Sequence, residues 1–180
     1  MTLRIADGLR SENRHALKEW GTVCDALAGG RAAVLIRKGG IRDRAPGFEA
    51  LHREFFFFPT RFHEKGETPP SHVDLSLYGR VLADYPVRDL APLRGLQDLH
   101  TVPWEDVEKR FHYGKEPGVH VLAVRAYPLE RPHRIEDAGR YEGCRSWVEF
   151  PSALPVKARG PSMTDPDFGV CLGLLKTALG

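Results

Sequence analysis

The sequence predicts an α+β fold, a small mixed and partly open β-barrel with peripheral helices. Strand-like and helix-like segments follow one another without the regular strand–helix–strand units of a doubly wound sheet. About six strand-like segments, separated by turn signals and short helices, suit a small barrel. In the run Glu54–Phe58 (EFFFF), alternate side chains point to opposite faces, so a strand here would be apolar on both faces and need cover on both.

Composition narrows the class of protein. With 180 residues we expect a single domain, with an N-terminal arm at 1–10, a core at 11–160 and a C-terminal helix at 161–180. The 26 basic and 24 acidic residues nearly cancel, so an anion-binding surface would have to be local. Neither a membrane span nor a signal-peptide core is recognisable, and we expect no membrane partner.

The three cysteines carry a further expectation. Cys24, Cys144 and Cys171 are odd in number and contain no Cys-x-x-Cys pair, which predicts reduced thiols in a cytoplasmic protein.

Hydrophobic spacing places the elements of the first half. A helix is expected from Ser11, as its N-cap, to Leu27, where Gly29-Gly30 would end it. A strand at Arg31–Arg37, a loop at 41–52 and the strand Arg53–Phe58 follow.

The second half alternates long strands with short helices. We expect a strand at Val73–Pro86, bent or bulged near Gly79, then a short helix at Asp89–Leu96 and a helix that begins at Pro103. A strand at Val119–Tyr127 and a loop containing Pro132 follow. The chain then continues with a strand at 145–150 and a helix at Asp165–Leu179. In the helix that opens at Pro103, Trp104, Val107 and Phe111 would share one face. The last helix would pack Phe168, Val170, Leu172 and Leu175.

Two candidate binding segments lie at strand ends. Arg37-Lys38-Gly39-Gly40 offers two cations for a phosphate and glycines that allow close backbone approach, although it lacks the P-loop spacing and also suits a polar turn. In Pro59–Glu64, Thr60 and Arg61 could bind an oxyanion, while His63 and Glu64 could exchange protons. A solvated loop after a buried strand is the alternative for that segment.

A third segment, Gly143–Trp147, combines a thiol, a guanidinium, a hydroxyl and an indole. Cys144 beside Arg145 could act as a nucleophile with His63 as base, and Trp147 could stack on a nucleobase. A buried cysteine and a core tryptophan are the alternatives. The remaining histidines show no ligand spacing, so neither a metal nor another cofactor is predicted.

Four separated motifs resemble an uncharacterised prokaryotic family labelled as a domain of unknown function. They are Lys18-Glu19-Trp20, Leu35–Ile41 (LIRKGGI), Phe57-Phe58-Pro59-Thr60 with His63, and Tyr141-x-Gly143-Cys144-x-Ser146-Trp147, across about residues 14–150. The resemblance implies that some relatives occur with restriction-type nuclease domains, for which this chain has no room. The family pattern has Glu-His-Gln after Pro-Thr, where this sequence has Phe62-His63-Glu64, so Glu64 would have to substitute for the carboxylate.

Residues 73–128 are also similar to the middle of PUA-like and ASCH-type barrels. That similarity implies a cleft that binds RNA or modified bases and, in a few members, a small hydrolase.

Together these observations predict a nucleic-acid- or nucleotide-binding module, linked by resemblance to restriction, defence or nucleic-acid processing. Its cleft would be lined by Arg37, Lys38, Gly39, Gly40, Thr60, Arg61, His63, Arg145, Ser146 and Trp147, with Trp147 or Trp104 as a stacking face. One alternative is a small hydrolase that uses His63 with Glu64 or Cys144. The other is a protein-interaction module without pocket chemistry.

Overall fold

A computed structural model describes residues 8–38, 52–60, 71–136, 138–141 and 146–180. Its strands form one six-stranded mixed sheet in the order β2-β5-β4-β3-β1-β6. They are β1 (Glu12–Trp20), β2 (Val34–Arg37), β3 (Glu54–Thr60), β4 (His72–Val87), β5 (Val119–Glu136) and β6 (Trp147–Pro155). The helices are α1 (Gly21–Ala28), α2 (Trp104–His112), α3 (Asp165–Leu179) and the 3₁₀ segments η2 (Ala91–Leu99) and η3 (Ala138–Tyr141).

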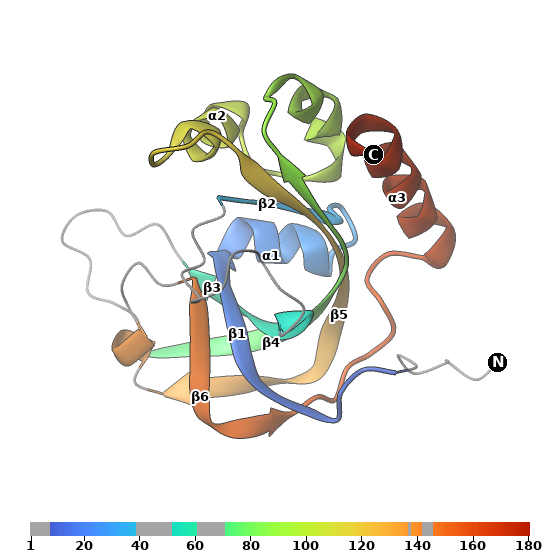
Figure 1. Ribbon diagram of the computed structural model, residues 1–180. Helices are drawn as coiled ribbons and strands as arrows, with labels where there is room; N and C mark the ends of the chain where they lie inside the picture. Colours follow the sequence, from blue (N-terminus) through green and yellow to red (C-terminus); the bar gives the residue numbers. More distant parts are fainter. Residues whose placement is uncertain (1–7, 39–51, 61–70, 137, 142–145) are drawn as a thin grey trace.

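The sheet curls strongly around α1 (Figure 1). β1 and β3 run parallel, and the other neighbouring strands pair antiparallel. The long pair β4–β5 bends around the molecule, while η2, α2 and α3 lie along one side (Figure 1). The predicted α+β fold with a partly open barrel and surrounding helices is therefore confirmed.

The phenylalanine run forms an internal strand, as predicted. All four rings of Phe55–Phe58 are 5% exposed or less. Phe55 and Phe57 belong to the larger apolar cluster, whereas Phe56 and Phe58 belong to a smaller one that includes residues of β6. β3 therefore separates two cores, which explains why it is apolar on both faces.

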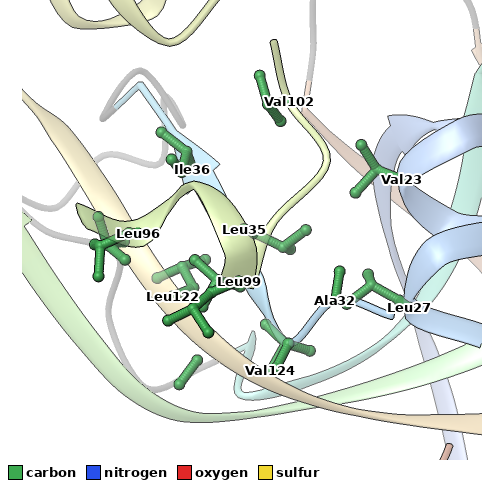
Figure 2. Packing of buried hydrophobic residues seen from close by; sticks show 14 of the residues in the cluster. Val23, Leu27, Ala32, Leu35, Ile36, Leu96, Leu99, Val102, Leu122 and Val124 are labelled. Carbon is green, nitrogen blue, oxygen red and sulfur yellow. The ribbon is translucent and has the colours of Figure 1, made fainter. Parts of the chain in front are cut away.

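The larger cluster lies between the sheet and the helices. Figure 2 shows α1 contributing Val23 and Leu27 and β2 contributing Leu35 and Ile36, close to residues of η2 and β5. The strand expected at Arg31–Arg37 is present as β2, which begins at Val34. The buried side chains of β2 hold its end in place, where Arg37 is the last residue and Lys38 follows.

The helix predicted from Ser11 to Leu27 is wrong in its first half. Glu12–Trp20 is β1, and the helix begins only at Gly21. β1 contains helix formers such as Ala, Leu, Lys and Glu, but it lies between β3 and β6 and pairs with both. Pairing on both sides outweighs the weak local propensity. The change of element at Trp20 moves Lys18 and Glu19 from a helix face to a strand end.

Several predictions for the second half need adjustment. β5 continues through Glu136, so the loop expected around Pro132 is a bulged part of a strand. The bulge predicted near Gly79 is confirmed, with Leu82 as the extra residue of β4; Gly79 itself is paired, and a Cβ there would lie 2.7 Å from the Phe57 ring. In α3, Phe168 and Leu175 are buried, but Val170 is 63% exposed and does not pack as expected.

The other expected helices are present. α3 has the predicted bounds, α2 begins directly after Pro103, and η2 covers the helix expected after Asp89. Val107 and Phe111 of α2 are buried and Trp104 packs partly against the same core, as predicted. The expected arm and the loop at 41–52 lie largely outside the described residues. Among the described residues, no helix has the length and apolarity to cross a membrane.

Candidate anion-binding site

A pocket of about 300 Å³ opens at one end of the sheet. β1, β2 and β3 all end there, and the residue before β6 completes its wall. The lining residues are Lys18, Glu19, Trp20, Ile36, Arg37, Lys38, Thr60, Arg110 and Ser146. The parallel register of Trp20 with Thr60 and the hydrogen bond from the Lys18 amide to the Ser146 carbonyl (2.8 Å) hold three of these chain segments together.

A buried carboxylate, Glu19, organises the pocket. The residue is 2% exposed. Nη1 of Arg37 donates to its Oε2 (2.7 Å), and Nη2 of Arg110 lies 3.9 Å from its Oε1, which also accepts from the Trp20 amide (2.9 Å). The Thr60 hydroxyl donates to the Glu19 carbonyl oxygen (3.1 Å). Glu19 therefore joins both cations to the ends of β1 and β3.

Arg110 reaches the pocket from α2. Its Nη1 donates to the Ile36 carbonyl (2.7 Å), and its guanidinium lies 4.4 Å from the centre of the Trp20 ring. Burial lowers the pKa of Arg110, and Glu19 opposes that effect. The contacts of Arg110 fix one cation over an aromatic face and beside a carboxylate, a geometry that Lys could not reproduce.

Lys38 is positioned by two backbone carbonyl groups. Its Nζ donates to the carbonyl oxygens of Phe111 (2.9 Å) and Glu116 (2.6 Å). Burial lowers the pKa of Lys38, while Glu116 acts in the opposite direction. The ammonium group thus caps the end of α2, where helix carbonyls and the helix dipole favour a cation.

Among the described residues, the pocket lining carries more cationic than anionic side chains. Four cationic side chains, Lys18, Arg37, Lys38 and Arg110, line it together with the carboxylate of Glu19. Because the whole chain carries a net charge of only +2, this surplus is local. Clustered guanidinium and ammonium donors of this kind suit a phosphate or another oxyanion.

A family model described as "Domain of unknown function (DUF1802)" matches residues 16–171. The chain belongs to this family. The match covers all four motifs that carried the resemblance, and all of the residues that line the pocket.

Among solved structures, the chain is similar to an ASCH protein from Zymomonas mobilis. A crystal structure of a mutant of that protein aligns with a TM-score of 0.50 and 13% identity over 77% of this chain and 90% of that chain. The crystal structure titled as ASCH from the same organism gives 0.49, 12%, 77% and 87%. At such identity the likeness shows the fold alone. A comparison with curated proteins finds no match.

Some of the residues that the sequence predicted for the cleft of this DUF1802 protein do line the pocket. Arg37 and Lys38 reach it from the end of β2, Thr60 from the end of β3, and Ser146 from the position before β6. Trp147 instead packs with its ring edge-on to Phe55 (5.2 Å between ring centres) and next to His52. Gly39, Gly40, Arg61, His63, Glu64, Cys144 and Arg145 lie outside the described residues, so their roles, including that of the hydrolase alternative, stay predictions.

The sequence did not single out five of the lining residues as site residues: Ile36, and the four polar or aromatic residues Lys18, Glu19, Trp20 and Arg110. Lys18, Glu19 and Trp20 belong to a family motif, but the helix expected there gave no reason to place them at a strand end. Arg110 comes from the charged face of α2 and is brought in only by the tertiary fold. The sequence of β1, ENRHALKEW, lacks a regular alternation of polar and apolar residues that could have marked Glu19 as buried.

The two described cysteines lie outside the pocket and have raised pKa values, which disfavours the reactive thiolate form. Cys24 is a buried thiol and Cys171 a partly buried one, neither in a disulfide, and burial raises the pKa of both. Within the described segments, no group of three or more His, Cys, Asp or Glu side chains is placed to hold a metal ion.

Proposed function

We propose that this chain is a nucleic-acid- or nucleotide-binding module and that its pocket binds a phosphate group of the ligand. The observation that carries the proposal is a pocket whose described lining includes four cations, two of which, Arg37 and Arg110, lie beside the buried carboxylate of Glu19. Electrostatic surplus in a nearly neutral protein is the footprint expected where a polyanion or nucleotide docks.

The cations are held before any ligand arrives. Glu19 fixes the guanidinium of Arg37, and the Ile36 carbonyl and the Trp20 ring fix that of Arg110. The two described side-chain bonds of Arg37 both leave from Nη1, and a guanidinium carries five N–H donors. Holding these groups in place lowers the ordering cost of binding an oxyanion.

Two further features support the proposal. A pocket of about 300 Å³ is at the lower end of the range for small-ligand sites, suited to one nucleotide unit or part of it. The similarity to PUA-like and ASCH-type barrels, which implies a cleft for RNA or modified bases, agrees with it by analogy of fold. A cytoplasmic protein that acts together with restriction-type nucleases, as the family resemblance implies, would bind nucleic acid.

A direct binding measurement tests the proposal. Single-stranded RNA, single-stranded DNA and duplex DNA are titrated into the protein at low salt and again at increasing salt. We expect at least one to bind, with an affinity that falls steeply with salt because each neutralised phosphate releases counterions. Lys38→Ala should weaken binding about tenfold and reduce the salt slope by about one unit.

The matched control removes a charge outside the pocket. Arg134 is exposed, pairs with Asp74 (3.0 Å) and lies near the end of β5, at the opposite end of the β4–β5 pair. Arg134→Ala should leave affinity nearly unchanged. Absence of binding by all three nucleic acids and by nucleotides at low salt would refute the proposal and leave a small anionic metabolite as the next ligand class to examine.

A further inference from the structure

Lys38 lines a second pocket as well as the first. This pocket measures about 150 Å³ and is formed by the end of β4, the start of β5 and the segment before β5. Its lining residues are Lys38, Pro86, Val87, Arg88, Glu116, Pro117, Gly118, Val119 and His120. Lys38 is the residue common to the two linings.

The position of Lys38 makes it a boundary between the pockets. Its two carbonyl partners, Phe111 and Glu116, lie at the end of α2 and in the wall of the second pocket. Gly118 keeps that wall close to β4: its φ is +138°, and a Cβ there would lie 3.0 Å from the Val87 carbonyl oxygen. The ammonium group is therefore built into the fold between two concave sites.

The second pocket carries its own polar groups. Arg88 is exposed and pairs with Glu116 at 3.4 Å. Nδ1 of His120 lies 2.8 Å from Oδ1 of Asp84, and this contact orients the imidazole ring. Arg88, Lys38 and the imidazole are donors of the kind that bind phosphate and sugar oxygens in nucleic-acid complexes.

We propose that the second pocket is the subsite for a neighbouring nucleotide unit, so that the ligand is a nucleic-acid strand spanning both pockets and not a free mononucleotide. This inference rests on the proposed function of the first pocket. Lys38 would contact the backbone between the two units, and Arg88 would bind the phosphate beyond it.

The Glu116 carboxylate explains why the second subsite needs a strand. It lowers the attraction of the second pocket for a free anion, whereas the first pocket has a cationic surplus. A strand held in the first pocket brings its next phosphate to Arg88 at high effective concentration. The exposed Arg88–Glu116 pair is then easily exchanged for an Arg88–phosphate contact, because solvent-exposed ion pairs contribute little.

The experiment compares uridine 5′-monophosphate with a six-nucleotide oligouridylate, using wild type, Arg88→Ala and Arg134→Ala. The latter two remove exposed, ion-paired arginines at opposite ends of the β4–β5 pair. We expect the hexamer to bind wild type at least tenfold more tightly than the monophosphate. Arg88→Ala should weaken the hexamer about tenfold and lower its salt slope by about one unit, leaving the monophosphate affinity unchanged.

The outcomes separate this inference from the proposed function. If the monophosphate binds and the hexamer binds no more tightly, or if Arg88→Ala and Arg134→Ala bind the hexamer equally, the second subsite is refuted while the first pocket stands. If neither probe binds wild type, and longer nucleic acids also fail, both proposals fall. Arg88 is a surface residue, and equal melting temperatures of the variants would exclude a folding defect as the cause of any difference.

Discussion

The two ends of the β1–β3 pair each hold a carboxylate paired with arginine, buried in the case of Glu19 and partly buried in the case of Glu54, and they differ in what surrounds that carboxylate. Glu19 is near the end of β1, and Glu54 is the first residue of β3. Because the strands are parallel and Trp20 aligns with Thr60, the two carboxylates lie at opposite ends of the pair. The strands are shared, so the contrast comes from the neighbours.

Among the described residues, the Glu54 end is a hydrogen-bonded network around one carboxylate and the guanidinium of Arg80. Arg80 binds its Oε1 through Nη2 (2.7 Å) and Nε (3.0 Å), while the Tyr78 hydroxyl donates to Oε2 (3.2 Å) and the Arg10 amide donates to the same oxygen (2.9 Å). Asn13 donates to the Glu54 carbonyl (2.7 Å) and to the Tyr78 oxygen (2.9 Å). One carboxylate meets one guanidinium, and the polar groups satisfy each other.

The Glu19 end has the same chemistry with a surplus. Its carboxylate meets Arg37 and Arg110, and two lysines line the pocket beside them. An ion pair shielded from solvent is therefore no sign of a binding site by itself, since Glu54 and Arg80 form a partly buried pair at the other end of the strands. Among the described residues, an excess of cationic side chains beside a cavity distinguishes the end that we propose as the binding site.

The largest expected effect comes from the strand that joins both ends. Phe57→Ala should lower the free energy of unfolding by about 3–5 kcal/mol, because its ring is buried against Gly79 and Phe55. Urea unfolding followed by circular dichroism and by tryptophan fluorescence should show one coincident transition. Leu82→Ala, at a 45% exposed position, is the control. Separate transitions would mean that the two ends are independent units, which would break the comparison.

Replacing each carboxylate by its amide sharpens the comparison. Glu19→Gln leaves Arg37 and Arg110 without a counter-charge and should cost about 3 kcal/mol, at the low end for a broken buried pair because the pocket admits water. Glu54→Gln leaves one arginine and should cost about 2 kcal/mol.

Inorganic phosphate separates the two amide variants further. It should restore part of the lost stability to Glu19→Gln by binding the unpaired guanidiniums of the folded state, and should give no such rescue to Glu54→Gln. Equal responses of the two melting temperatures to phosphate would contradict the assignment of the Glu19 end as the anion site.

Many of the strands and helices could be predicted from the sequence, because the residues that indicate each one lie within it. The phenylalanine run, the apolar β2 segment and the C-terminal helix were each predicted from residues inside the segment, and the structure has a strand or helix at each of these places. β1 was lost because its residues favour a helix when considered alone, and only pairing with β3 and β6 makes it a strand.

The candidate site divides in the same way. Arg37 and Thr60 could be predicted because they end recognisable strands, and Ser146 because it lies directly before one. Arg110 could not, since its partner Glu19 lies 91 positions earlier and nothing local links α2 to the end of β1. Contacts between segments so distant in the chain are set by how the sheet closes, and a single sequence carries no direct trace of them.

A smaller effect tests whether the Glu54 end is purely structural. Tyr78→Phe removes the hydroxyl that contacts Glu54 and Asn13 and should cost about 1 kcal/mol of stability. Burial raises the pKa of Tyr78, so the hydroxyl stays protonated and donating throughout the neutral range. Nucleic-acid affinity should equal that of wild type. A loss of affinity in the correctly folded variant would show that the two ends are coupled.

The smallest expected effect is a loss of folding stability at acidic pH caused by His100, which lies near Arg110. His100 is buried, its Nδ1 accepts from the Val102 amide (3.1 Å), and burial, together with the positive charge of Arg110, lowers its pKa below 6.5. The folded state thus disfavours the protonated ring, so the stabilising contribution is complete above pH 6.5 and is lost as the pH falls through the folded-state pKa.

His100→Asn keeps a side-chain acceptor for the Val102 amide but cannot titrate, so it isolates that loss. Between pH 7.5 and pH 6 the wild type should lose at most about 0.8 kcal/mol more than His100→Asn, the limit for a group with an unfolded pKa of 6.5. The measurement is urea unfolding at both pH values. His15→Asn is the parallel variant, because burial and the neighbouring His52 lower the pKa of His15 in the same direction. If His100→Asn and wild type lose equal stability on acidification, His100 is not held neutral by the fold, and the end containing Arg110 is no more sensitive to acid than the rest of the sheet.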